Sequence, residues 1–209
     1  LQALGSPQVT LLVSDGGARM HLPSGSYGWG ISTADQTLVE CSGEVTGYPL
    51  QSFRCEAMGR LSGLLFLYHY VTFHQVSPVG TLATYLDNSG VILMEEKVLA
   101  YPYIFPSLAC AGDVDVLLAL RSIHAKLSWP RITTTHVKGH QDRTASLASL
   151  PLPAQLNVRA DTLATAYLDL LEHSPPHPRL FYFPTAVSTF STRTSKSQAR
   201  SYQCCATQW

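Results

Sequence analysis

The sequence predicts an α/β fold with a mixed five-stranded sheet, three antiparallel strands followed by parallel ones, flanked by helices. Three β-type runs come first and are joined by short polar turns. After them, stretches with apolar residues at helical spacing alternate with short β-branched runs. Hydrophobic residues make up 45% of the chain and charged residues 13%, which is typical of a globular protein and not of a disordered one.

The first strand is expected to end at an acidic residue. An apolar run occupies residues 9–13, and Gly16 and Gly17 are expected to end the strand with a turn. Asp15 would then lie where a central strand ends. Because the two glycines have no side chain, a ligand or another backbone can approach this point closely.

The remaining elements are predicted from the spacing of apolar and turn-forming residues. Ser52 is expected to cap the first helix, and residues 97–111, which show no clear periodicity, are expected to form a connecting loop. The expected strands are 26–33, 37–45, 81–86 and 131–137, and the expected helices are 53–70, 89–96, 113–127 and 155–172.

The charge divides the chain into two parts. Residues 1–172, expected to form one domain, hold 10 Lys and Arg against 14 Asp and Glu, whereas residues 173–209 hold four basic residues and no acidic one. The second part is rich in Pro, Ser and Thr and is expected to be a poorly ordered tail. A protein that binds a polyanion usually carries a basic excess on its folded part, and this one does not.

No membrane association is expected. The longest apolar stretch, Leu61–Phe73, is too short to cross a bilayer, and the N-terminus lacks a signal-peptide pattern. The five cysteines are irregularly spaced and form no CxxC pair, which favours a reduced intracellular setting, cytoplasmic or nuclear. Because the chain begins with Leu1, it is expected to be a piece of a longer polypeptide.

Four acidic residues are candidates for a metal centre. Asp15 and Asp87 each follow an expected strand, Glu56 lies near the start of the first helix, and Asp161 shares a helix face with Asn157. If the first and fourth strands are neighbours, Asp15 and Asp87 converge at one edge of the sheet. Clustered carboxylates repel unless cations neutralise them, and oxygen ligands select Mg²⁺ or Mn²⁺. Two such ions ~3.5–4 Å apart can clamp both oxygens of a phosphoryl displacement.

Five sequence blocks, in this order along the chain, carry a resemblance to a known family. They resemble a type 1 ribonuclease H domain of the variety found at the ends of retroelement reverse transcriptases, and the resemblance covers about residues 9–170. The blocks are VSDGG at 13–17, FRCEAMG at 53–59, YLDNSG at 85–90, HVKGHQD at 136–142 and NVRADTLA at 157–164.

The resemblance implies an endonuclease that hydrolyses the RNA strand of an RNA–DNA hybrid with two Mg²⁺ ions, for which Mn²⁺ can substitute. It implies that Asp15 bridges both metals and that Glu56 and Asp87 complete the site of the metal nearer the leaving group. Asp161 would hold the metal that activates the attacking water. The products would carry 5′-phosphate and 3′-hydroxyl ends.

The resemblance also implies how the hybrid is held. His140, on a mobile loop, would help to protonate or release the product, and Gly16 and Gly17 would let the backbone approach the minor groove of the hybrid. RNA would be recognised by its 2′-hydroxyls and by duplex shape. The interval from His140 to Asp161 is longer than in cellular members, and no Lys/Arg-rich helix is visible around 97–111. Other domains of a reverse transcriptase polyprotein, or the basic tail, are therefore expected to contribute affinity.

Two other functions remain open from the sequence. One is a catalytically inactive nucleic-acid-binding or tethering remnant of the same fold, which the neutral charge favours and the presence of all four acids opposes. The other is a different enzyme of the superfamily, such as an integrase or a proofreading exonuclease.

Several conspicuous residues have structural explanations. Asp113 and Asp115 are expected to act through capping and the helix dipole, Cys55 to be buried, and Trp29 to pack in the core. The corresponding structural alternative for Glu56 is an acid on the surface of the first helix turn.

Overall fold

The computed structural model describes most of the chain up to the end of its last helix. The expected tail lies outside the described residues, apart from His173. The described residues are 2–5, 8–19, 21–22, 24–47, 50–101, 103, 106–109 and 112–173.

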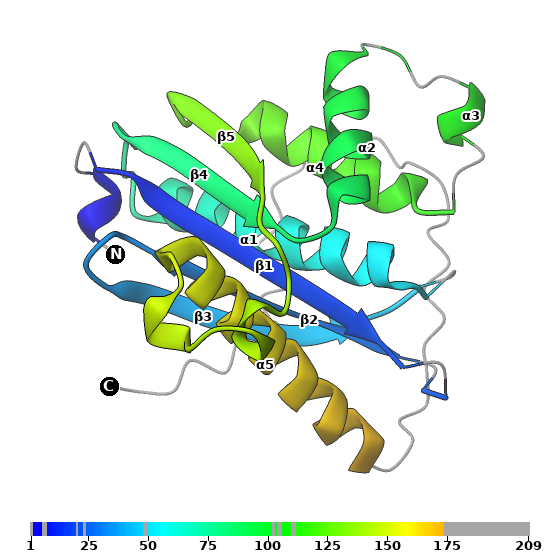
Figure 1. Cartoon of the computed structure of the whole chain (residues 1–209). Helices are drawn as coiled ribbons and strands as arrows, with labels where there is room; N and C mark the ends of the chain where they lie inside the picture. Colours follow the sequence, from blue (N-terminus) through cyan, green and yellow to red (C-terminus); the bar gives the residue numbers. More distant parts are fainter. Residues whose placement is uncertain are drawn as a thin grey trace, which may run out of the picture. The chain divides into compact units, whose positions relative to one another are not determined.

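Five strands form one mixed sheet in the order β3-β2-β1-β4-β5, as Figure 1 shows. β1, β2 and β3 pair antiparallel, and β1, β4 and β5 pair parallel. This arrangement confirms the predicted fold class and makes β1 the central strand. The strands are β1 Thr10–Ala18, β2 Gly25–Ser32, β3 Thr37–Val45, β4 Thr81–Leu86 and β5 Arg131–His136.

Helices cover both faces of the sheet. α1 packs on β1 and β2 from one side and contacts α2 and α4, whereas α5 packs on β1, β2 and β3 from the opposite side (Figure 1). The helices are α1 Ser52–Phe73, α2 Ser89–Ala100, α3 Pro106–Ala109, α4 Val114–Lys126 and α5 Leu152–His173. Short 3₁₀ turns cover Gln2–Gly5, Gln141–Arg143 and Leu147–Ser149.

The two-residue period of β1 divides the core between these helix layers. Leu12 is buried in the larger cluster that includes α1, whereas Leu11 and Val13 belong to a smaller cluster with Leu156 of α5. Because successive side chains of a strand point to opposite faces, an apolar run buries both faces of this central strand. The expected burial of Trp29, 2% exposed, is confirmed.

β1 continues past its predicted end. Gly16 pairs with Tyr27 and Gly17 with Ser26, so both glycines belong to the strand and Asp15 lies inside it. The prediction that the glycine pair ends the strand is therefore wrong. Pairing with β2 satisfies this backbone, and pairing with a segment distant in sequence cannot be read from the glycines alone.

Helix boundaries also differ from the prediction. Gln51, and not Ser52, occupies the N-cap position of α1, and its side chain makes no capping hydrogen bond. α2 extends to Ala100, so part of the expected 97–111 loop is helical. Asn88 caps α2 by accepting hydrogen bonds from the backbone N–H groups of its first turn, which explains why this helix begins directly after β4.

Of the two acids at the start of α4, Asp115 lies in the first helical turn as predicted, but the predicted capping by Asp113 is wrong. Asp113 makes no side-chain capping hydrogen bond, and both Asp113 and Asp115 form ion pairs with Arg54 of α1. Arg54 is 5% exposed, so these contacts pair a buried charge and join α1 to α4. Among the described residues, none of the helices is both long and apolar enough to cross a membrane.

Candidate active site

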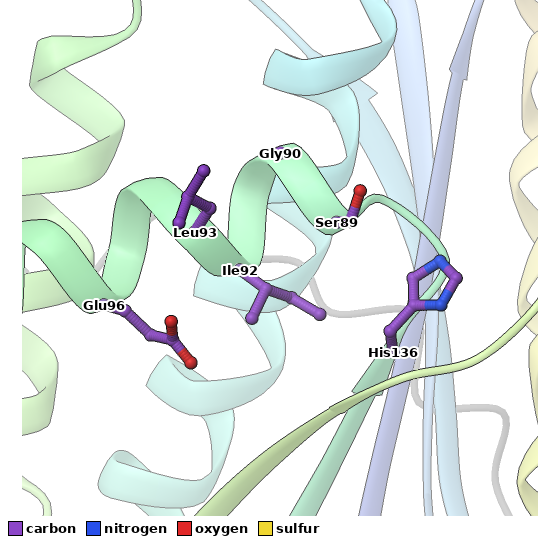
Figure 2. Close-up of a pocket in the computed structure, with 6 residues that line it drawn as sticks. All are labelled: Ser89, Gly90, Ile92, Leu93, Glu96 and His136. Atoms are coloured by element: carbon purple, nitrogen blue, oxygen red, sulfur yellow. The ribbon is translucent and has the colours of Figure 1, made fainter.

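A pocket of about 380 Å³ lies between the first half of α2 and the end of β5 (Figure 2). His136 is its one lining residue outside α2, and Nε2 of His136 lies 2.9 Å from the backbone oxygen of Asp87. Glu96 supplies its one carboxylate. The lining of the pocket therefore contains no cluster of acids. Through His136, however, the pocket lies next to Asp87, which belongs to such a cluster.

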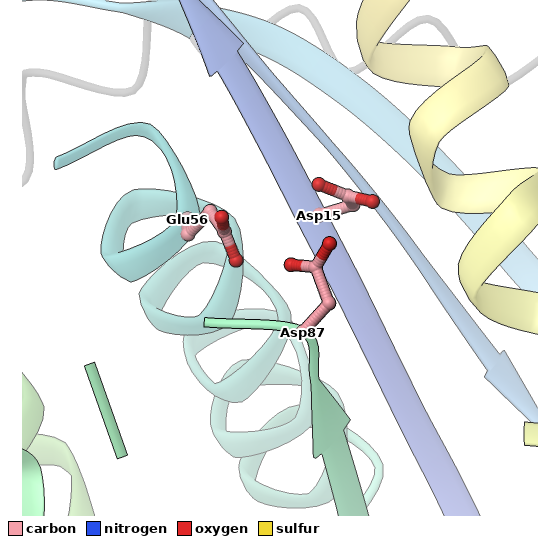
Figure 3. A group of neighbouring side chains, drawn as sticks. All are labelled: Asp15, Glu56 and Asp87. Atoms are coloured by element: carbon pink, nitrogen blue, oxygen red, sulfur yellow. The ribbon is translucent and has the colours of Figure 1, made fainter. Parts of the chain in front are cut away.

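Three acids from separate elements meet beside this pocket. Asp15 comes from β1, Glu56 from α1, and Asp87 directly follows β4; one carboxylate oxygen of each lies within 4.8 Å of the others (Figure 3). Parallel pairing of β1 with β4 brings Asp15 and Asp87 together, as the sequence predicted for neighbouring strands. α1 crosses the same part of β1 and contributes Glu56.

Gly16 allows α1 to approach this closely. A Cβ at Gly16 would lie 2.6 Å from the backbone oxygen of Cys55 and 2.7 Å from the backbone nitrogen of Glu56. Any larger residue would therefore push α1 and Glu56 away from β1. Gly17 has more room, since its Cβ would meet a leucine side chain at 3.7 Å. The expected contacts of both glycines with a hybrid stay predictions.

Asp15 and Glu56 are buried and Asp87 is half-buried, and the hydrogen bonds of these acids do not use all of their oxygens. Asp15 is 6% exposed and Glu56 4%. Within the described structure, Oε2 of Glu56 and Oδ1 of Asp87 are buried without a hydrogen-bond partner. A buried polar atom without a partner is costly, so these oxygens are suited to a cation. The surface alternative for Glu56 is wrong, because β1 covers it.

Amide and hydroxyl groups donate hydrogen bonds to Asp15 and Glu56 and hold them in place. Asn157 of α5, 1% exposed, donates from Nδ2 to Oδ2 of Asp15 at 3.2 Å. Asn88 Nδ2 and Ser52 Oγ donate to Oε1 of Glu56, both at 3.4 Å. Neither Asn88 nor Asn157 is predicted as a site residue from the sequence, where Asn157 is notable only for sharing a helix face with Asp161. The available signals were an amide next to Asp87 and an amide one helical turn before Asp161.

The electrostatics of the site favour proton or cation binding. Burial and the charges of Asp87 and Asp161 raise the pKa of Asp15 to about 7, partly offset by the hydrogen bonds from Gly16 and Asn157. Burial and contact with Asp87 raise the pKa of Glu56 well above its ordinary value. A divalent cation would neutralise the same charges that these protons neutralise.

Asp161 and His140 lie beside the group of Asp15, Glu56 and Asp87 and outside it. Asp161 is about half exposed on α5, and its charge still raises the pKa of Asp15. Nδ1 of His140 lies 3.7 Å from Oδ2 of Asp161. The structure thus brings the fourth predicted acid near the other three, at the side where His140 lies.

The loop that carries His140 is anchored to the end of β4. The Val137 backbone N–H donates to the oxygen of Leu86 at 2.8 Å, and Gly139 packs so closely on the carboxylate of Asp87 that an added Cβ would overlap it. His140 has a positive φ of 51°, a conformation uncommon for residues other than glycine. The contact of Gly139 with Asp87 thus places this loop against the acidic site.

Comparison with known proteins identifies the fold. No family model and no curated protein sequence matches this chain. Among solved structures, LC11-RNase H1 in complex with an RNA/DNA hybrid aligns with a TM-score of 0.55 and 16% identity, over 78% of this chain and 99% of that one. The N-terminal RNase H domain of Rv2228c from Mycobacterium tuberculosis aligns with a TM-score of 0.50 and 18% identity, over 79% and 96%.

A viral protein shows the same similarity. The protease-reverse transcriptase of Prototype Foamy Virus aligns with a TM-score of 0.50 and 19% identity, and the match covers 75% of this chain but only 20% of the viral one. At these identities the comparisons establish architecture and not activity. The chain therefore has the fold of a type 1 ribonuclease H-like domain, as its sequence blocks predicted.

Proposed function

We propose that this domain is an endonuclease that hydrolyses the RNA strand of RNA–DNA hybrids with two divalent cations. The observation that carries the proposal is the group Asp15, Glu56 and Asp87, in which one oxygen of each residue lies within 4.8 Å of the others. Two oxygens of this group are buried without a hydrogen-bond partner in the described structure. Carboxylate oxygens of this kind fit Mg²⁺, with Mn²⁺ as a substitute. The similar structure solved with an RNA/DNA hybrid supports the choice of substrate.

The chain's own residues have distinct roles in this proposal. Asp15, Glu56 and Asp87 would hold one cation, and Asp15 would share the second with Asp161. When bound, such a pair of ions supplies an activated water and stabilises the leaving oxygen of the phosphodiester. Asn157 keeps Asp15 oriented through the 3.2 Å hydrogen bond to Oδ2.

His140 is proposed to move a proton during product release. Its Nδ1 faces Asp161 at 3.7 Å, so Nε2 is the ring nitrogen available to a phosphate or hydroxyl group. The side chain is half exposed, which leaves room for rotation at the edge of the site.

The test is a cleavage assay with an end-labelled RNA–DNA hybrid, with and without Mg²⁺. Asp15→Asn and Asp87→Asn are expected to abolish cleavage while circular dichroism shows a retained fold. Asp35→Asn, at an exposed turn between β2 and β3, is the matched control and should cleave like the wild type. Cleavage that persists in Asp15→Asn or Asp87→Asn, or that needs no divalent cation, would overturn the metal assignment. Duplex and single-stranded DNA substrates test for an integrase or exonuclease activity instead.

An inactive nucleic-acid-binding or tethering domain is the second candidate. The ion pairs of Arg19 and Arg159 favour its tethering form, because they reduce the free positive charge that would attract a nucleic acid to the described surface. Calorimetric titration with Mg²⁺ separates the two candidates, because a site that binds no Mg²⁺ supports the inactive domain. In either case other domains of a reverse transcriptase polyprotein are proposed as partners, a setting suggested by the foamy virus similarity.

A further inference from the structure

Most arginines that link one element of this fold to another are already paired with acidic side chains. Each of four arginines forms an ion pair with an acid on a different element or loop, and two of the four are at most 5% exposed. Charges that are paired in this way attract a polyanion weakly, since the partner acid cancels the local potential. The four are Arg19 with Asp169 and Glu172, Arg54 with Asp113 and Asp115, Arg60 with Glu95, and Arg159 with Glu40.

Two exposed cations instead lie on the loop beside the acidic site. Lys138 and Arg143 flank His140 in sequence, and among the described residues neither takes part in an ion pair. Their side chains are therefore available to a ligand. The loop between them touches the carboxylate of Asp87 through Gly139.

Hydrogen bonds make this loop a compact unit. The Gln141 side chain donates from Nε2 to the backbone oxygen of Lys138 at 2.7 Å, and the backbone N–H of Arg143 donates to the oxygen of His140 at 3.3 Å. Both cationic residues are thus tied to the same short turn as His140. That turn lies next to Asp161, 3.7 Å from Nδ1 of His140.

We propose that Lys138 and Arg143 form a phosphate clamp that binds the sugar-phosphate backbone of the RNA–DNA hybrid at the edge of the active site. The inference rests on the proposed function. A hybrid must bring its phosphates to a site of four acids, on a part of the chain with a net charge of −4, so nearby positive charge is needed to attract it. The phosphate clamp supplies that charge where the site needs it, in place of a basic helix around 97–111.

The experiment compares two double variants that remove the same charge from opposite ends of β5. The test variant is Lys138→Gln with Arg143→Gln. The control is Lys126→Gln with Arg131→Gln, at the end of α4 and the start of β5. Binding of a fluorescent RNA–DNA hybrid to the full chain is measured by anisotropy in EDTA over a series of salt concentrations, with melting temperatures as a check on folding.

The test variant is expected to raise the Kd about tenfold and to reduce the slope of log Kd against log salt by about 2, one for each lost phosphate contact. The control should change the Kd less than threefold and leave the slope as in the wild type. Equal changes in Kd in both variants would show that only the net charge of the protein matters. An unchanged Kd in both variants would place the charge that binds the hybrid elsewhere, such as the 173–209 segment. Either result overturns the phosphate clamp.

Kinetics separate this inference from the proposed function. In a domain that cleaves the hybrid, the test variant should raise KM and retain kcat. Cleavage with an unchanged KM in the test variant would overturn the phosphate clamp alone. A third outcome is also distinguishable. If the wild type does not cleave the hybrid with Mg²⁺ but its binding still depends on Lys138 and Arg143, the proposed activity is overturned and the phosphate clamp stands.

Discussion

The substitution Asp15→Asn is expected to stabilise the metal-free domain in a pH-dependent way. In the unfolded chain Asp15 ionises near 3.8, whereas burial and neighbouring charges raise its pKa in the folded protein to about 7. As the pH rises, the unfolded state therefore releases this proton at a lower pH than the folded state does. The free energy of unfolding falls as the pH rises between these two pKa values. Asparagine has nearly the same shape and no charge, so the variant lacks this loss.

The magnitude follows from the two pKa values. Each pH unit between them costs the wild type about 1.4 kcal/mol, so the whole window costs about 4 kcal/mol. The gap in free energy of unfolding between Asp15→Asn and the wild type is then expected to widen by about 4 kcal/mol from pH 4 to pH 8, and to change little above pH 7. Most small domains are stable by only about 5–15 kcal/mol, so this effect is readily measured.

Urea denaturation in EDTA at several pH values measures this gap, with Asp35→Asn as a control whose curve should run parallel to the wild type. Adding Mg²⁺ at pH 8 should stabilise the wild type by about 2.7 kcal/mol when the ion is at a hundred times its Kd, and should leave Asp15→Asn nearly unchanged. A gap that does not vary with pH, or an equal response of both proteins to Mg²⁺, would refute the account of the buried acids.

Three further predictions concern the surroundings of the acids. Gly16→Ala should lower the free energy of unfolding by about 1–3 kcal/mol, because its Cβ would lie 2.6 Å from the oxygen of Cys55; urea denaturation with unchanged stability would contradict this packing. Asn157→Ala should weaken Mg²⁺ binding by roughly 10–100-fold in calorimetry, because Asp15 loses its orienting hydrogen bond, and an unaltered Kd would remove that role. His140→Ala should slow hybrid turnover without eliminating it, and a complete loss of cleavage would mean that the histidine does more than assist product release.

Local patterns in the sequence predicted much of the fold. The bounds of β3, 37–45, and of β4, 81–86, agree with the structure, because turn formers on either side limit each run. The end of β1 was missed for the opposite reason. Gly16 and Gly17 look like a turn locally, and only their pairing with β2 keeps them in the strand.

The candidate residues of the site could be named from the sequence alone. Asp15, Glu56, Asp87 and Asp161 could be selected as candidates because each lies in a recognisable sequence block, near an expected strand end or on an expected helix. Their residue type already favours hard divalent cations as ligands, because carboxylate oxygens suit such ions in any fold.

Only the tertiary structure decided which of these acids meet and how deeply each one is buried. Glu56 is 4% exposed because a glycine in β1 lets α1 approach, whereas Asp161, on the outer part of α5, stays about half exposed. Asn157 became part of the site through a contact with a strand more than a hundred residues away. Burial, pKa and hydrogen bonding depend on the distances between segments remote in sequence, and periodicity within one segment carries no information about those distances.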